Sequence, residues 1–143
     1  MSVTAWESTL PALPRPAFEM HDRFEEVIEL GLSGADYAIL FHLAARMQTG
    51  NRVAINQRAI AAAIRVSPET VRRSLSVLRA TRLLLSPDEG LSVINPVYLV
   101  HNIAERSQLV KAFGNIDVVR GVRAARRTRP MPRRGHLALV SSR

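Results

Sequence analysis

Apolar residues recur at intervals of three and four along the first half of the chain, which is the spacing of helices with one buried face. This spacing predicts a helix over residues 18–30, ended by Gly31, and a second helix that starts at Ser33 and is ended by Gly50. Ser33 is placed to cap the second helix, with Asp36 three residues on as in a capping box. Its core-facing stripe comprises Ile39, Leu40, Leu43, Ala44 and Met47, and Tyr37 and Phe41 form a second apolar stripe.

Two further helices follow a short edge strand. Residues 52–55 alternate in polarity and predict the strand, and Asn56 is the expected cap of a helix over residues 57–64. Ser67 followed by Pro68 marks the start of the next helix, which we expect to run to about Thr81. Proline is favoured there because the N–H that it lacks would have no partner within the helix.

A β-hairpin is predicted next. The apolar residues 83–85 and 91–94 flank the turn-forming sequence Ser-Pro-Asp-Glu-Gly. Asn95 and Pro96 end the second strand, since proline cannot donate to a strand ladder. Residues 97–100 are apolar and should pack on the body, and residues 104–113 predict a last helix.

The two ends of the chain differ from this pattern. Residues 1–17 contain Pro11, Pro14 and Pro16 and predict a flexible arm. Residues 115–143 predict a largely disordered tail, because seven arginines between positions 120 and 134 leave little apolar surface to bury. The predicted folded domain therefore spans residues 18–114.

The distribution of charge indicates a polyanionic partner. Lys and Arg number 20 against 12 Asp and Glu, a net charge of +8. The first 50 residues have a net charge of −4 (three basic, seven acidic), residues 51–99 of +4 (seven and three), and residues 100–143 of +8 (ten and two). Every basic residue except Lys111 is an arginine, the residue best suited to bind phosphate and guanine through two hydrogen bonds.

The helix that starts after Ser67 has a polar face opposite its apolar one. With Val71, Leu75 and Leu78 in the core, Glu69, Arg73 and Ser76 lie on the other side, flanked by Thr70 and Arg72. Short helix, turn, longer helix and hairpin in this order predict a mainly α fold with a small β-hairpin, a winged helix-turn-helix. The candidate DNA contacts are Asn56, Gln57, Ser67, Glu69, Thr70, Arg72, Arg73 and Ser76.

These side chains have distinct expected roles on double-stranded DNA. Arg73 can bind guanine O6 and N7 or a phosphate, and Glu69 can accept from cytosine N4. Ser67 and Thr70 lie where the N-terminus of a helix favours a backbone phosphate. A winged helix that binds another protein through the same face is the alternative.

Three sequence features carry a family resemblance over residues 32–114. The segment GLSGADYAILFHLAARM ends in Arg–Met before Gly–Asn, and GNRVAINQRAIAAAIRVSPETVRRSLSVLRATRLLL contains Ser67-x-x-Thr70-Val71. In GLSVINPVYLV, Asn95–Pro96 follows the second strand, with Tyr98 two residues on. The stretch resembles the winged-helix plasmid replication initiators of the RepL type. The resemblance implies a sequence-specific DNA-binding protein that starts plasmid replication at an origin, and a winged-helix transcription regulator is the closest alternative.

Catalysis is not expected. A DNA-nicking initiator needs a Tyr nucleophile beside a metal held by closely spaced histidines, whereas Tyr37 and Tyr98 lie in apolar patterns typical of core residues. The chain contains no cysteine and no Gly-rich loop ending in Lys–Ser/Thr. We therefore expect no cofactor and no metal site. The four histidines are far apart in the sequence: His21, His42, His101 and His136.

The remaining expectations concern partners. The acidic residues of segment 19–29 would repel DNA, so this segment should face away from the duplex. Together with the second stripe of Tyr37 and Phe41, it is a candidate surface for a second copy of the chain or for host replication proteins. The alternative is that these residues pack within the chain. No run reaches the ~18 apolar residues of a membrane span, and signal-peptide features are missing, so we expect a cytoplasmic, nucleoid- or plasmid-associated protein.

The Arg-rich tail is either a solvated terminus or a non-specific DNA arm.

Overall fold

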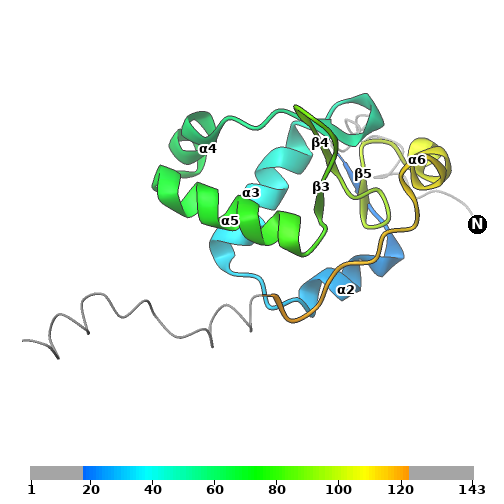
Figure 1. The fold of residues 1–143 in the computed structure, drawn as a ribbon, viewed down its shortest axis with the longest axis horizontal. Helices are drawn as coiled ribbons and strands as arrows, with labels where there is room; N and C mark the ends of the chain where they lie inside the picture. The colour runs from blue at the N-terminus through cyan, green and yellow to red at the C-terminus, as the bar shows by residue number, and fades with distance from the viewer. Residues whose placement is uncertain (1–17, 123–143) are drawn as a thin grey trace, which may run out of the picture.

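The computed structural model describes residues 18–122 (Figure 1). About half of these residues are helical, in five α-helices and three short 3₁₀ helices. The strands form one three-stranded and one two-stranded antiparallel sheet. The fold is therefore mixed rather than mainly α, since the expected hairpin is part of a larger sheet and a second sheet accompanies it.

Helix α3 (Gly34–Ala45) is the central element, and its predicted capping box is confirmed. Ser33 Oγ accepts from the Asp36 N–H at 3.1 Å, and Asp36 Oδ2 accepts from the Ser33 N–H at 3.0 Å. The predicted stripe is buried, each member being no more than 5% exposed: Ile39, Leu40, Leu43, Ala44 and Met47.

The second apolar stripe of α3 packs within the chain. The ring of Phe41 lies 6.0 Å from that of Phe18 and 6.2 Å from those of Phe24 and Tyr37, centroid to centroid. In the described structure Tyr37 and Phe41 therefore pack against other residues of the chain, and both side chains remain half-buried.

Helices α4 (Gln57–Ile64) and α5 (Pro68–Ala80) confirm the two predicted helices. The turn between them contains Arg65, whose φ of 59° closes α4 in the left-handed conformation. Helix α5 packs on both α3 and α4. Its predicted core residues Val71, Leu75 and Leu78 are at most 1% exposed.

Three strands form the sheet beside α5 in the order β2 (Arg52–Val53), β4 (Leu91–Ile94), β3 (Leu84–Asp88). The predicted edge strand and hairpin are confirmed, although the hairpin turn is shorter than expected. Strand β3 continues to Asp88, with an irregular register after Leu85, and Gly90 takes a φ of +76° in the turn.

The helix predicted over residues 18–30 is wrong for most of its length. Residues Glu19–Met20 form strand β1, Asp22–Phe24 the 3₁₀ helix η1, and α2 comprises Glu25–Ile28 alone. Strand β1 pairs with β5 (Leu99–Val100), so contacts with residues 80 positions away override the local helical pattern. Gly31, with a φ of +67°, ends the segment as predicted.

The chain after β5 also packs on the body. Ile103–Glu105 form η3 and Arg106–Phe113 form α6, at the end of the molecule opposite α4 (Figure 1). Residues 115–120, which we term the C-terminal strap, were assigned to the tail from sequence. Val118 of the strap is 8% exposed, and the Val119 N–H donates to the Thr81 carbonyl at 3.0 Å. The predicted arm (1–17) and the rest of the tail (123–143) lie outside the described residues.

Within residues 18–122, no helix combines the length and the apolar character needed to cross a membrane.

Candidate nucleic-acid interface

The first turn of α5 is held by its own side chains. Ser67 is the N-cap, and its Oγ accepts from the Thr70 N–H at 3.1 Å. The hydroxyl oxygens of Ser67 and Thr70 are 2.9 Å apart and share a hydrogen bond. Pro68 occupies the first helical position, as predicted. The structure thus brings the two residues expected near a phosphate together at the helix N-terminus, where anions are favoured.

The polar face of α5 is exposed. The side chain of Arg73 is 71% exposed, that of Arg72 60% and that of Glu69 50%. Thr70 and Ser76 are half-buried at the margins of this face. Because the opposite side of α5 is buried in the core, the position of the helix is fixed and its polar side chains point into solvent.

Glu69 binds its neighbours on this face. Its two carboxylate oxygens accept from Nε and Nη2 of Arg72 at 2.8 and 2.5 Å. The Nε of Arg73 lies 3.7 Å from Glu69 Oε1, close enough to interact by charge. The hydrogen bond from Arg72 holds the pKa of Glu69 below its ordinary value, so the carboxylate is charged at neutral pH. The face therefore carries one anion between two cations.

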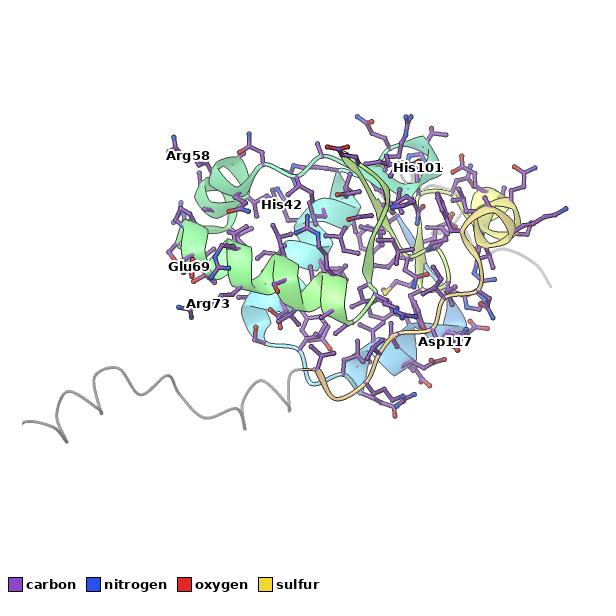
Figure 2. All side chains as sticks on the ribbon, viewed as in Figure 1. His42, Arg58, Glu69, Arg73, His101 and Asp117 are labelled. Carbon is purple, nitrogen blue, oxygen red and sulfur yellow. The ribbon has the colours of Figure 1, made fainter. Side chains whose placement is uncertain are left out.

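Helix α4 adds arginines that the sequence analysis did not select. Arg58 and Arg65 are exposed, and Figure 2 shows Arg58 at the same end of the molecule as Glu69 and Arg73. The signal was present in the spacing, because Arg58, Ala62 and Arg65 recur at intervals of four and three, opposite the buried Ile60.

The two residues predicted on α4 have different environments. Asn56 is the N-cap, and its Oδ1 accepts from the Ala59 N–H at 3.1 Å. This bond uses one of the two hydrogen bonds that the amide oxygen can accept. Gln57 is exposed at the first position of α4.

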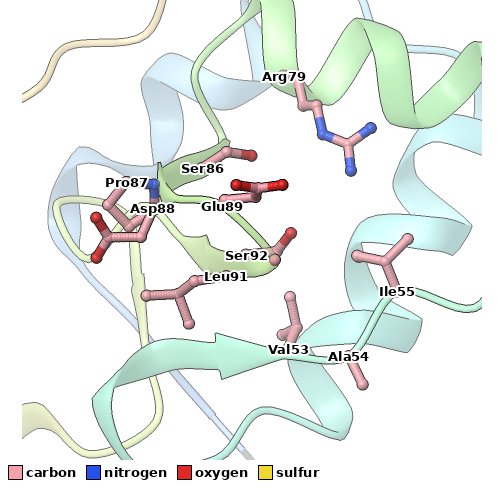
Figure 3. A pocket seen from close by; sticks show the side chains of 11 residues that line it. Val53, Ala54, Ile55, Arg79, Ser86, Pro87, Asp88, Glu89, Leu91 and Ser92 are labelled. Atoms are coloured by element: carbon pink, nitrogen blue, oxygen red, sulfur yellow. The ribbon is translucent and has the colours of Figure 1, made fainter.

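A pocket of about 680 Å³ lies between residues 53–55, Arg79 of α5 and residues 86–92 of the hairpin. Arg79 lies on the α5 wall, and Asp88 and Glu89 lie on the hairpin (Figure 3). Residues 86–90, at the tip of the hairpin, include two acidic residues and no basic one. The hairpin turn is thus less suited to phosphate than the exposed face of α5.

Comparison with protein families matches residues 26–123 to the Firmicute plasmid replication protein (RepL) family. The chain belongs to the RepL family. The match starts in α2, includes α3, α4, α5 and the hairpin, and ends just after the C-terminal strap. It confirms the resemblance and extends it beyond residues 32–114 on both sides. Searches of the curated proteins and of the solved structures gave no match.

Two buried asparagines hold the base of the hairpin within the RepL match. Asn95, described from sequence as the end of a strand, donates from Nδ2 to the carbonyls of Arg82 at 2.9 Å and Ile116 at 2.8 Å. Its Oδ1 accepts from the Val97 N–H at 3.0 Å. This one side chain therefore connects the end of α5, the end of the hairpin and the strap.

Asn51, which the sequence analysis missed, has an equivalent role on the other side of the sheet. It ends the 3₁₀ helix η2 (Thr49–Asn51) with a φ of 61°, a conformation that asparagine tolerates better than most residues. Its Nδ2 donates to the carbonyls of Ile94 at 2.8 Å and Leu99 at 2.7 Å. No local sequence signal distinguishes it, because all its partners are distant in the chain.

Tyr98 is buried in the core, Tyr37 is half-buried against it, and both hydroxyls are hydrogen-bonded. Tyr37 donates to the Val27 carbonyl at 3.4 Å, and the Tyr98 oxygen accepts from the Val118 N–H at 2.9 Å. Burial raises the pKa of both phenols. Figure 2 shows His42 and His101 well apart, and residues 18–122 contain no group of three side chains placed to hold a metal ion.

Proposed function

We propose that this RepL chain binds duplex DNA at a plasmid origin, with α3, α4, α5 and the β3–β4 hairpin acting as a winged helix-turn-helix. The observation that carries the proposal is the division of α5 into two faces. Val71, Leu75 and Leu78 anchor one face in the core, while the arginines of the other face are more than half exposed. A recognition helix needs this arrangement to enter the major groove.

The contacts in this proposal start at the N-terminal turns of α5. Arg73 is placed to bind guanine O6 and N7, and Ser67 and Thr70 lie beside a backbone phosphate at the helix N-terminus. Arg58 of α4 and Arg65, in the turn after α4, are further exposed cations for the neighbouring phosphates. The acidic turn of the hairpin makes α4 and α5, rather than the wing, the main source of affinity.

The end of the molecule that carries α2 is proposed to face away from the duplex. Asp22 and Glu25 are exposed there and would repel phosphates. A second copy of the chain and host replication proteins are the partners we consider for this end.

Enrichment of bound fragments from a mixture of plasmid and host DNA tests the proposal. We expect the purified chain to recover repeats at a plasmid origin. Recovery of promoter-proximal sites alone would contradict the role in initiation and favour transcription regulation. Failure to enrich any duplex sequence would instead favour a winged helix that binds protein.

A further inference from the structure

Glu69 occupies the hydrogen-bond donors with which Arg72 would bind a phosphate. The Nε and Nη2 atoms of Arg72 donate to separate oxygens of the Glu69 carboxylate, at 2.8 and 2.5 Å. This two-pronged geometry is the one in which a guanidinium binds a phosphate. In the unbound protein the carboxylate thus stands where a DNA phosphate oxygen pair would otherwise bind.

Arg73 has a different relation to the same carboxylate. Its Nε lies 3.7 Å from Glu69 Oε1, beyond hydrogen-bond distance, and its side chain is 71% exposed. The two adjacent arginines are therefore unequal. Arg72 is held in a bidentate pair, whereas Arg73 retains its donors for another partner.

The pair between Glu69 and Arg72 is exposed and spans three residues of one helix turn. Such a pair is close in free energy to its separated state, so a well-placed partner can replace it. A phosphate that meets Arg72 must nevertheless displace the carboxylate and approach a negative charge. This cost weighs most on a complex held by backbone contacts alone, whereas a complex held by base contacts of Arg73 can leave the pair of Glu69 and Arg72 intact.

We propose that Glu69 is a specificity-determining residue, which restrains Arg72 from the phosphates of non-target DNA and leaves Arg73 to bind the bases. The inference rests on the proposed function of α5 as the DNA-binding helix. It assigns to Glu69 a role through Arg72 rather than through a cytosine.

The test compares the wild-type chain with Glu69→Gln on two probes, a duplex of random sequence and the duplex most enriched from plasmid DNA. We expect the variant to bind the random duplex about tenfold more tightly, with a salt dependence steeper by about one unit, as for one added phosphate contact. Binding to the enriched duplex should gain less, so that the ratio between the two affinities falls.

Two controls separate this role from a general effect of charge. Glu25→Gln makes the same change in net charge on α2 and should alter neither affinity by more than about twofold. The double variant Arg72→Ala with Glu69→Gln should lack the gain on random duplex that Glu69→Gln shows alone.

Other outcomes would overturn either the role of Glu69 or the proposed function. Equal behaviour of Glu69→Gln and Glu25→Gln on random DNA overturns the inference while leaving the proposed function in place. A changed preference at one base pair, with random-sequence affinity unaltered, also overturns it and assigns Glu69 a direct base contact. A wild-type chain that binds neither duplex overturns the proposed function itself.

Discussion

The two ends of the molecule use arginine in different ways. Beside α2, Arg23 donates to Glu26 at 2.7 and 3.0 Å and to Asp117 at 2.7 Å, and Arg120 donates to Glu29 at 2.8 Å. Two of these partners lie 94 and 91 positions away in the sequence. On α5, by contrast, the arginines interact with a glutamate three or four residues away.

The difference extends to the surroundings of the charges. The Arg23 side chain is 30% exposed, and its guanidinium lies 5.3 Å from the centre of the buried Tyr98 ring. Arg120 is 54% exposed, and Arg72 and Arg73 of α5 are 60% and 71% exposed. Distant partners tie segments of the fold together, whereas local, exposed pairs leave cations that a ligand can recruit. The location of an arginine's partner is thus more informative than the number of arginines.

Removal of the C-terminal strap should have the largest effect on stability. A chain ending at Gly114 loses Val118 from the core and one hydrogen bond each from Tyr98 and Asn95, so its free energy of unfolding should fall by about 3–5 kcal/mol. A chain ending at residue 122 keeps these contacts and should unfold at the wild-type urea concentration. Equal stability of the two truncated chains would contradict the structural role of the strap.

The chain that ends at residue 122 also tests the Arg-rich tail. If the tail binds phosphates, this truncation should weaken binding on every DNA sequence alike and flatten the salt dependence. An unchanged salt slope would exclude the tail from the interface.

Asn95→Ala should have the next largest effect. The substitution leaves two carbonyl groups and the Val97 N–H without the bonds that Asn95 provides, and we expect a loss of about 2–3 kcal/mol in urea unfolding. Asn56→Ala is the matched control at the α5 end, since it removes an exposed helix cap and should cost about 1 kcal/mol. Similar losses for the two variants would refute the assignment of Asn95 as the connection between α5, hairpin and strap.

The α2 end should also be sensitive to acid. The hydrogen bond from Arg23 lowers the pKa of Glu26, so this interaction stabilises the fold above the ordinary pKa of the carboxyl and is lost as the pH falls through its lowered value. Arg23→Ala should lower the free energy of unfolding by about 1 kcal/mol at neutral pH. The difference in free energy of unfolding between this variant and the wild type should become smaller below about pH 4.5.

Arg72→Ala provides the comparison at the α5 end. Its pair with Glu69 is exposed, so the substitution should leave the free energy of unfolding close to the wild-type value throughout the same pH series. A constant difference between Arg23→Ala and wild type across the series would show that the contribution of Arg23 does not depend on the charge of Glu26.

Sequence alone was sufficient for the elements whose signals are local. Ser33 with Asp36, Asn56, and Ser67 with Pro68 each determine a helix start from neighbouring residues, and all three starts are confirmed. The helix prediction for the segment that forms β1 was wrong because its partner strand lies about 80 positions later. The strap was missed for the same reason, since its contacts with Asn95 and Tyr98 appear only after folding.

The candidate site could likewise be predicted only in part. The exposed face of α5 was evident from the periodicity of its apolar residues, and the spacing of Arg58 and Arg65 carried a further signal that was not used. The choice of partner by Glu69 could not be predicted, because both Arg72 and Arg73 lie within reach on the same helix surface and side-chain geometry decides between them.

The most direct test of the account compares Arg73→Ala with Lys111→Ala, which removes one positive charge from α6 at the opposite end of the molecule. On the enriched duplex, Arg73→Ala should cost about 1–3 kcal/mol and relax the preference at one base pair, while its effect on random duplex remains smaller. Lys111→Ala should bind both duplexes as the wild type does. Equal losses for the two variants, or an equal loss for Arg73→Ala on both duplexes, would contradict the assignment of α5 as the helix that reads DNA sequence.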